Sequence, residues 1–364
     1  MPSDLIRTLC FRASRDAVIP GLDGLRCYAA LFVILAHSNL VAPGWGATGV
    51  WLFFVLSGLL LTPSLVRAVR STSALREVAA YVIRRVFRIM PALIVVVAVA
   101  CVVIWAPKRG IFNLELFWQH VTFQVSRWHL WTTKTEMLLY LVLPIIVWAM
   151  AALQGWRLAV GLALVLAGSF WLTEHSTIFI IRTDLKREMS VYATPFLLGM
   201  ALAFVTPAVA RLRKLSFWIG AVGLVALSSD IAPLIAFRES VGIPVDNLPW
   251  RIPILIYPFA GLTVFGAAGN ASWILNNRVV TTIGVVGFSV YLWQTFVLHV
   301  LRRNGIADPV LLFTLVLPLT LFLSFLTYHL IEVPGQRLGA KIADSISARK
   351  ARVGKTEEER LAAL

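Results

Sequence analysis

The chain has 364 residues, of which 59% are hydrophobic and only 14% are charged, and its mean hydropathy is +0.82. A soluble domain of this size would need far more charge to cover its surface, so this composition excludes that class and indicates a polytopic membrane protein. The net charge of +15 does not indicate nucleic-acid binding, because Lys and Arg are spread over the loops between apolar segments.

The spacing of the cysteines and the composition of the two ends of the chain give further expectations about this membrane protein. No cysteine stands in a CxxC or other ligand-like spacing, so we expect neither a disulfide framework nor a metal site. Residues 1–20 lack the apolar run of a cleaved signal peptide and are expected to form a cytoplasmic segment. Residues 337–364 form a basic cytoplasmic tail, predicted to be partly disordered or a surface-lying helix. The predicted transmembrane domain is residues 21–336.

Ten windows are apolar and long enough, at about 20 residues, to cross the hydrocarbon core of a membrane. They lie near 22–41, 48–66, 89–106, 137–154, 158–173, 191–207, 215–231, 252–269, 280–300 and 309–330. With the N-terminus inside, most Lys and Arg residues fall in segments that would be cytoplasmic. The sequence therefore predicts an all-α transmembrane bundle of about ten helices with both termini in the cytoplasm.

The first window, within GLDGLRCYAALFVILAHSNL, carries two ionisable side chains. Arg26 and His37 are close to three helical turns apart, so both project from one side of the helix, about 16 Å apart along its axis. Arg26 is expected at the cytoplasmic end and His37 at the outer end. A hydrogen-bonding role for His37 and a snorkelling role for Arg26 are the structural alternatives. A same-face pair that spans the membrane favours a functional role.

The second window, GATGVWLFFVLSGLLL, is rich in small residues. Gly46, Gly49 and Gly58, with Ser57 between them, would permit close contact between helices. No GxSxG elbow surrounds Ser57, so the sequence does not predict that it is a nucleophile.

The third window is entered from the cytoplasm through YVIRRVFRIMPAL. Arg84, Arg85 and Arg88 cluster there, and their spacing places Arg85 and Arg88 on one helical face. Anchoring by the positive-inside rule would explain basic residues at this boundary. An arginine cluster beside Arg26 would also bind a diphosphate, because guanidinium donors match phosphate oxygens in geometry.

The fourth window begins in HLWTTKTEMLLYLVLPII and carries Glu136 near its start. An even-numbered span runs from outside to inside, so Glu136 is expected at the same outer depth as His37. A carboxylate beside an imidazole fixes its tautomer and stabilises the cation formed when it takes a proton, which suits a general base. A purely structural ion or hydrogen-bonded pair is the alternative.

Six segments resemble, in order, the landmarks of the acyltransferase-3 family of membrane acyltransferases. They are LDGLRCYAALFVILAH, GVWLFFVLSGLLL, YVIRRVFRIMPAL, LWTTKTEMLLYLVLP, GFSVYLWQ and IEVPGQRL. The most specific elements are Arg-x10-His, here Arg26 to His37, and FFxxSG, at residues 53–58. An RxxR element at Arg85 and Arg88 and the later carboxylate at Glu136 strengthen the resemblance, which runs from about residue 21 to residue 338.

The resemblance implies transfer of acyl groups, commonly acetyl, from cytoplasmic acyl-CoA to hydroxyls of envelope glycans or other carbohydrate-bearing molecules. It maps the family's histidine onto His37 and the CoA-facing arginines onto Arg26, Arg85 and Arg88. We expect a direct transfer in a bacterial cytoplasmic membrane, with membrane lipids as surroundings and without a cofactor, metal or nucleic acid. The predicted site residues are His37 and Glu136 for catalysis, Arg26, Arg85 and Arg88 for acyl-CoA, and Asp23, Ser57 and Tyr140 in support.

Three positions depart from the family pattern. Trp51 stands where the family often has Asp, Gln294 stands where YLWH is usual, and Met137 follows Glu136 where a second acidic residue is frequent. These changes concern the acceptor more than acyl transfer itself. A transporter or flippase that uses Arg26, His37 and Glu136 as a substrate or proton path is the alternative, and a non-catalytic scaffold is the third hypothesis. No internal repeat of the transporter kind is evident in the sequence.

Overall fold

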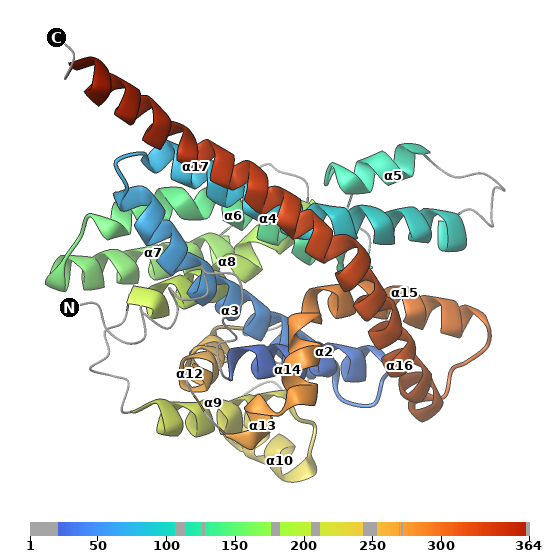
Figure 1. Cartoon of the computed structure of the whole chain (residues 1–364). Coiled ribbons are helices and arrows are strands. Elements are labelled where there is room, and N and C mark those ends of the chain that lie inside the picture. Colours follow the sequence, from blue (N-terminus) through green and yellow to red (C-terminus); the bar gives the residue numbers. More distant parts are fainter. Residues whose placement is uncertain are drawn as a thin grey trace. The chain divides into compact units, whose positions relative to one another are not determined.

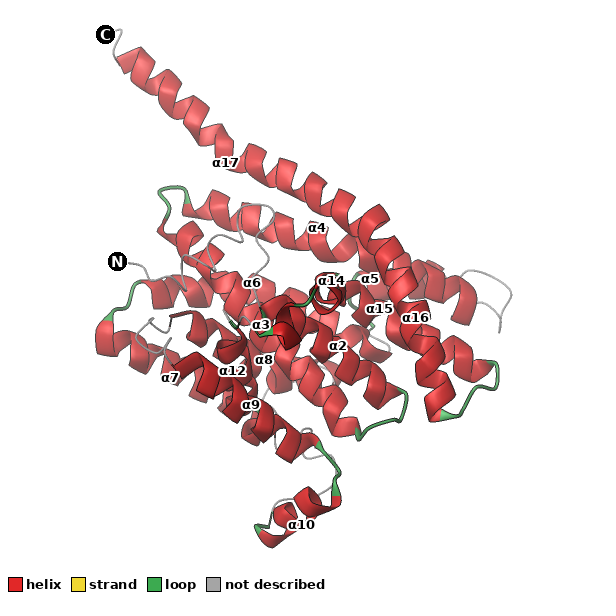
Figure 2. Ribbon diagram, turned by 60° about the horizontal axis from the view of Figure 1, so that its bottom comes forward, coloured by secondary structure: helices red, strands yellow, loops and turns green. Residues whose placement is uncertain are grey.

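The computed structural model describes residues 21–105, 114–125, 128–175, 183–204, 212–242, 253–268, 270 and 272–361. All the regular elements within these ranges are helices, and none is a strand (Figures 1 and 2). The predicted class, an all-α helical membrane bundle, is therefore confirmed.

Each of the ten predicted windows overlaps at least one helix, although several helices begin or end well outside the window. The α-helices are α2 (Leu22–His37), α3 (Pro43–Arg70), α4 (Ala74–Ala100), α5 (Leu114–Val121), α6 (Trp131–Ala151), α7 (Gly155–His175), α8 (Thr183–Phe204), α9 (Arg213–Ser228), α10 (Ala232–Ser240), α12 (Tyr257–Ala267), α13 (Trp273–Asn276), α14 (Arg278–Val285), α15 (Gly287–Arg303), α16 (Pro309–Thr327) and α17 (Val333–Leu361). The described residues also form two π-helices, Cys101–Trp105 and Tyr328–Glu332, and two 3-10 helices, Trp128–Leu130 and Pro253–Leu255.

Several of these helices are long and apolar enough to cross a membrane. Within the described ranges there are five by length and composition, or up to seven if two sharply bent pairs each count as one span. Helix α6 shows why such helices suit lipid, because its Leu141, Ile145 and Trp148 side chains are all more than half exposed. The protein is thus an integral membrane protein. The count of ten spans and the cytoplasmic position of both termini stay predictions.

The chain forms two compact units. Unit 1 comprises Met1–Pro63, Ser126–Thr135 and Leu162–Phe325, and unit 2 comprises Ser64–Val125, Glu136–Gly161 and Leu326–Leu364. The predicted residues His37, Arg26, Asp23 and Ser57 belong to unit 1. Arg85, Arg88, Glu136 and Tyr140 belong to unit 2.

Close helix contacts in unit 1 depend on small residues at defined places. A Cβ on Gly58 of α3 would lie 1.9 Å from the carbonyl oxygen of Phe196 in α8, so only glycine permits this approach. The glycine of the FFxxSG element therefore packs two helices together, as the small residues of the second window predict. Trp51 is fully buried and lies edge-on to Tyr257, with ring centroids 5.3 Å apart. The residue that replaces the family's acidic side chain is a packing residue of this unit.

The predicted window 280–300 is two helices rather than one. Helices α14 and α15 meet at Val286 with a bend of 75°. Asn277 caps α14 by accepting a hydrogen bond from the Val280 N–H at 3.0 Å. At the other end of α14, a Cβ on Gly284 would lie 1.7 Å from the backbone oxygen of Asp23. The bend therefore lies next to a tight contact between α14 and α2.

In unit 2 the C-terminal part of the chain forms helix α17, and the predicted cytoplasmic position of this tail stays a prediction. Helix α17 lies along α4 (Figure 1), and Gly335 and Gly339 permit the contact because a Cβ on Gly339 would lie 2.4 Å from Phe87. Arg84 of α4 faces Asp344 of α17, with 3.6 Å between the guanidinium and carboxylate atoms. The first half of α17 is therefore a packed part of unit 2.

Candidate active site

His37 is the last residue of α2, and its ring is fixed by a residue far away in the sequence. Its Nδ1 lies 2.9 Å from Oε1 of Gln294, which is on α15 and only 1% exposed. An amide oxygen is an acceptor, so Nδ1 carries the hydrogen and donates it. The other ring nitrogen, Nε2, then has a free lone pair and is the basic atom of this imidazole.

The backbone end of His37 is held as well. A guanidinium N–H of Arg302, in the last turn of α15, donates to the His37 carbonyl oxygen at 2.8 Å. Carbonyl groups in the last turn of a helix lack partners within that helix, and a cation there is favourable for the helix dipole. Two residues of α15, Gln294 and Arg302, therefore set where the end of α2 lies.

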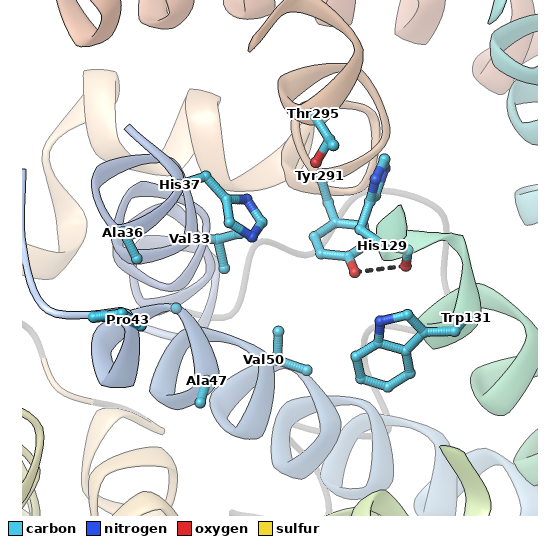
Figure 3. A pocket seen from close by; sticks show the side chains of 11 residues that line it. Val33, Ala36, His37, Pro43, Ala47, Val50, His129, Trp131, Tyr291 and Thr295 are labelled. Carbon is cyan, nitrogen blue, oxygen red and sulfur yellow. Dashed lines mark hydrogen bonds between the residues drawn. The ribbon is translucent and has the colours of Figure 1, made fainter. Parts of the chain in front are cut away.

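A cavity of about 280 Å³ opens beside the His37 ring within unit 1. The rings of His37, Tyr291 and Trp131 surround its space in Figure 3, with small residues of α2 and α3 on the remaining sides. The lining residues are Val33, Ala36, His37, Pro43, Gly46, Ala47, Val50, His129, Trp131, Tyr291 and Thr295. An apolar cavity with a few polar groups is typical of a small-molecule site.

His129 is a second histidine of this cavity, and it is held differently. Its Nε2 donates to the Leu292 carbonyl at 3.0 Å, and the Tyr291 hydroxyl donates to the His129 carbonyl at 2.9 Å (Figure 3). Burial, together with the nearby His37 ring, lowers the pKa of His129 from 6.5 to about 3. His129 is therefore a neutral residue that fastens its 3-10 helix to α15, whereas His37 is the more accessible imidazole.

Arg26 lies at the other end of α2 and forms an ion pair. Its guanidinium is 2.9 Å from the carboxylate of Asp23, which is 1% exposed. Asp23, predicted as a supporting residue, is thus brought to Arg26. By helical rise the Arg26 and His37 positions are about 16 Å apart along the helix. The predicted separation of a cationic end from an imidazole end is realised on one helix.

The second group of predicted residues gathers within unit 2. Arg85 is half-buried on α4 and interacts electrostatically with Arg88, Glu136 and Tyr140. The Tyr140 hydroxyl donates a short hydrogen bond to a carboxylate oxygen of Glu136, and the Arg85 guanidinium stands 5.8 Å from the centre of the Tyr81 ring. Unit 2 therefore holds two neighbouring cations with one carboxylate beside them, a charge pattern that suits a polyanion.

The structure brings some predicted residues together and leaves other pairings as predictions. His37 has Gln294 as its side-chain partner, whereas Glu136 has Tyr140 and Arg85. The pairing of His37 with Glu136 stays a prediction. Ser57 is half-buried on α3, beside a glycine used for helix packing. Over the part of the chain that the structure describes, no group of three or more His, Cys, Asp or Glu side chains could hold a metal ion.

Sequence reasoning missed the roles of three residues of this site: Gln294, His129 and Tyr291. Gln294 is a visible departure from YLWH, but 257 positions separate it from His37 and no spacing rule links them. His129 and Tyr291 stand beside recognised segments, directly before LWTTKTE and inside GFSVYLWQ. The available signal was a polar or aromatic residue inside or directly before a recognised segment.

The fold and site together define an all-helical integral membrane protein with an imidazole at a small cavity and a cluster of arginines. Residues 19–329 match the model of the acyltransferase domain of the acyltransferase-3 family, and the chain belongs to that family. It is 27% identical, over 89% of its length, to a protein of Staphylococcus aureus (strain COL) that is provisionally named as an O-acetyltransferase. It is 25% identical, over 93% of its length, to the O-acetyltransferase OatA of Staphylococcus aureus (strain MRSA252).

These relatives are longer than this chain. The matches cover 58% of the first relative and 60% of OatA, so the chain spans about three fifths of the length of the curated relatives it matches. No solved structure matches the chain. The function of this chain is therefore inferred from its family and from the geometry of its own site.

Proposed function

We propose that this protein is a membrane O-acyltransferase that moves an acyl group, acetyl in the first instance, from acyl-CoA to a hydroxyl of a carbohydrate-containing acceptor. The family and the names of the relatives support acyl transfer to oxygen. The observation that carries the proposal is the His37 ring, whose Nδ1 is engaged and whose Nε2 is left as a base at a cavity.

The reaction needs a base because a sugar hydroxyl is a poor nucleophile at neutral pH. Nε2 of His37 takes the hydroxyl proton while the oxygen attacks the carbonyl carbon of the thioester. The carbon–sulfur bond then breaks, the thiolate leaves and receives the proton from the imidazolium, and the ester and free CoA thiol remain. General-base catalysis of this kind typically contributes ~10²–10⁴-fold. A histidine is suited to both proton transfers because it titrates near neutrality.

The donor's phosphates are assigned to arginine. Arg85 and Arg88 form the cation pair of unit 2, and guanidinium groups bind phosphate through geometrically matched donors. Glu136 and Tyr140 hold Arg85 in this proposal, because Glu136 interacts with Arg85 and accepts from the Tyr140 hydroxyl. Arg26 is assigned to the same donor from its position on α2, about 16 Å by helical rise from the His37 base.

The acceptor class is assigned from the lining of the cavity. Trp131 and Tyr291 offer aromatic faces, and His37 and Thr295 offer polar atoms, which together suit a ring that carries hydroxyls. The volume of the cavity, about 280 Å³, is small compared with the volumes of most ligand-binding sites. The expected occupant is therefore one sugar-sized group with its reacting hydroxyl.

The test uses the full chain, purified into lipid nanodiscs, with acetyl-CoA labelled in the acetyl group and envelope glycans as acceptors. Label should appear in an alkali-labile ester of the glycan. His37→Ala should lower transfer by at least ~10²-fold, since the base is lost, while acetyl-CoA affinity measured by calorimetry stays near the wild-type value. Transfer by His37→Ala at the wild-type rate would place the base elsewhere, and a trapped acyl-enzyme would overturn the direct route.

A transporter is the second candidate, and two bent helix pairs favour it. Helices α9 and α10 are bent by 88° and α14 and α15 by 75°, and discontinuous helices are common at transporter substrate sites. In that case acetyl-CoA or a glycan precursor would cross the membrane of a sealed liposome chemically unchanged. Formation of the labelled ester decides for the enzyme.

A further inference from the structure

The His37 ring has an unusual partner for a histidine base, a buried primary amide rather than a carboxylate. Nδ1 donates to Oε1 of Gln294 at 2.9 Å, and the Gln294 side chain is 1% exposed on α15. Nothing in the family pattern explains this residue, because Gln294 stands at one of the positions where the sequence departs from it. The contact links α2 to α15 at the edge of the cavity.

The amide of Gln294 has a side-chain partner at each of its two polar atoms. Its Nε2 donates to the Thr295 hydroxyl oxygen at 2.6 Å, which leaves Oε1 to face His37. A buried amide that lost these partners would carry the cost of an unsatisfied polar group, so both contacts stabilise the position of the Gln294 side chain. With Oε1 facing the ring, His37 is the tautomer that carries its hydrogen on Nδ1.

We propose that Gln294 is the positioning residue of the His37 base: it holds the tautomer and the ring plane that leave Nε2 free at the cavity. The catalytic part of this inference, that His37 is a base, rests on the proposed function. The structural part, that Gln294 positions the ring, rests on the contact itself. Gln294 acts through His37 and does not touch the reacting atoms. Gln294, which departs from the YLWH pattern, thus has a specific role in this protein.

A neutral partner has a consequence that a carboxylate would not have. A carboxylate on Nδ1 would favour the imidazolium form of His37, whereas an amide accepts the hydrogen bond without adding negative charge. The other charged or titratable groups near the ring are Arg302, His129 and Tyr291, and His129 is neutral. Among the described residues that line the cavity there is no acidic side chain. Neither the partner of Nδ1 nor the described lining of the cavity therefore adds a negative charge beside the base.

The experiment measures steady-state transfer from labelled acetyl-CoA by the full chain in nanodiscs across the pH range, for two variants. Gln294→Leu removes the acceptor at similar size and should lower kcat by roughly 10- to 100-fold, with little change in KM for acetyl-CoA. Gln294→Glu keeps an acceptor and adds charge. It should retain activity at high pH, with the acid limb of the pH–rate profile moved up by about one unit or more.

The matched control is Gln119→Leu, which removes a glutamine whose side-chain amide donates to the Glu115 carboxylate on the short helix α5. It should leave kcat and the profile at wild-type values. If Gln294→Leu kept the wild-type kcat, the proposal would be overturned. It would also be overturned if Gln294→Glu lost activity equally at every pH and the acid limb of its pH–rate profile did not move. That is the result expected if Gln294 has only a structural role.

A second measurement does not depend on activity. Diethyl pyrocarbonate modifies unprotonated imidazole nitrogen, and mass spectrometry of the His37 peptide gives the rate at each pH. The midpoint should rise in Gln294→Glu relative to wild type. A raised midpoint in a protein that transfers no label would keep the contact and reject the proposed function, whereas transfer with an unmoved midpoint would reject the role of Gln294.

Discussion

At the scale of single residues, the two histidines that line the cavity have different roles because their surroundings differ. His37 ends a helix, is partly accessible and is hydrogen-bonded through one nitrogen to an amide. His129 is buried, bonds a backbone carbonyl and is neutral because burial lowers its pKa to about 3. The polar contacts therefore favour His37 for proton transfer and give His129 a structural task.

The pKa of His129 predicts how stability depends on pH. Between about pH 6.5 and about pH 3 the unfolded chain binds a proton on this residue that the folded protein does not bind. The contribution to the free energy of unfolding is therefore fully present above about pH 6.5 and is lost progressively as the pH falls. His129→Gln keeps an N–H donor for the Leu292 carbonyl without titrating. Its Tm should fall less than that of wild type between about pH 7.5 and about pH 5. Equal falls, measured by intrinsic fluorescence, would show that His129 is protonated in the folded protein.

At the scale of elements, apolar length predicted where helices are but not where one of them bends. The segment TTIGVVGFSV is apolar on both sides of Val286, so hydropathy shows no boundary there. Near the end of α14, Gly284 lies against the backbone of Asp23 in α2, a contact between segments far apart in the sequence. Gln294 and His37 meet in the same way. Periodicity gives the face on which a residue lies, whereas the neighbour across that face depends on tertiary packing.

The contact of α14 with α2 predicts a large effect from a single methyl group. Gly284→Ala would place Cβ 1.7 Å from the Asp23 backbone oxygen, and two backbones must separate to relieve it. We expect destabilisation by about 1–3 kcal/mol. Gly168→Ala on α7 is the control, because its Cβ would meet nothing within 4 Å beyond the local backbone of its own helix, and alanine favours a helix. Thermal unfolding in the same detergent compares the two. Equal stability of both variants would mean that α14 does not approach α2 so closely.

At the scale of the whole molecule, the two units hold different halves of the proposed chemistry. Unit 1 contains the imidazole, its amide partner and the cavity, and unit 2 contains the arginine pair with its carboxylate. Because the His37 base lies in unit 1 and the arginine pair in unit 2, substitutions of the base and of that pair should alter different kinetic constants. A loss of base function lowers kcat, and a loss of donor binding raises KM for acetyl-CoA.

The arginines of α4 offer a direct test of that division. Arg88→Ala should weaken CoA binding by roughly 10-fold or more, because one guanidinium that matches phosphate oxygens is lost, and Arg88→Lys should restore only part of it. Arg84→Ala is the matched control on the same helix: Arg84 faces Asp344 at 3.6 Å in an exposed pair, so CoA affinity should stay unchanged. Calorimetry with CoA gives the affinities, and transfer assays should show KM rising while kcat at saturating donor is kept. Unchanged CoA affinity in a folded Arg88→Ala protein would show that this cluster does not bind the donor phosphates. An equal loss of affinity in Arg84→Ala would show that the effect comes only from the general positive charge of α4.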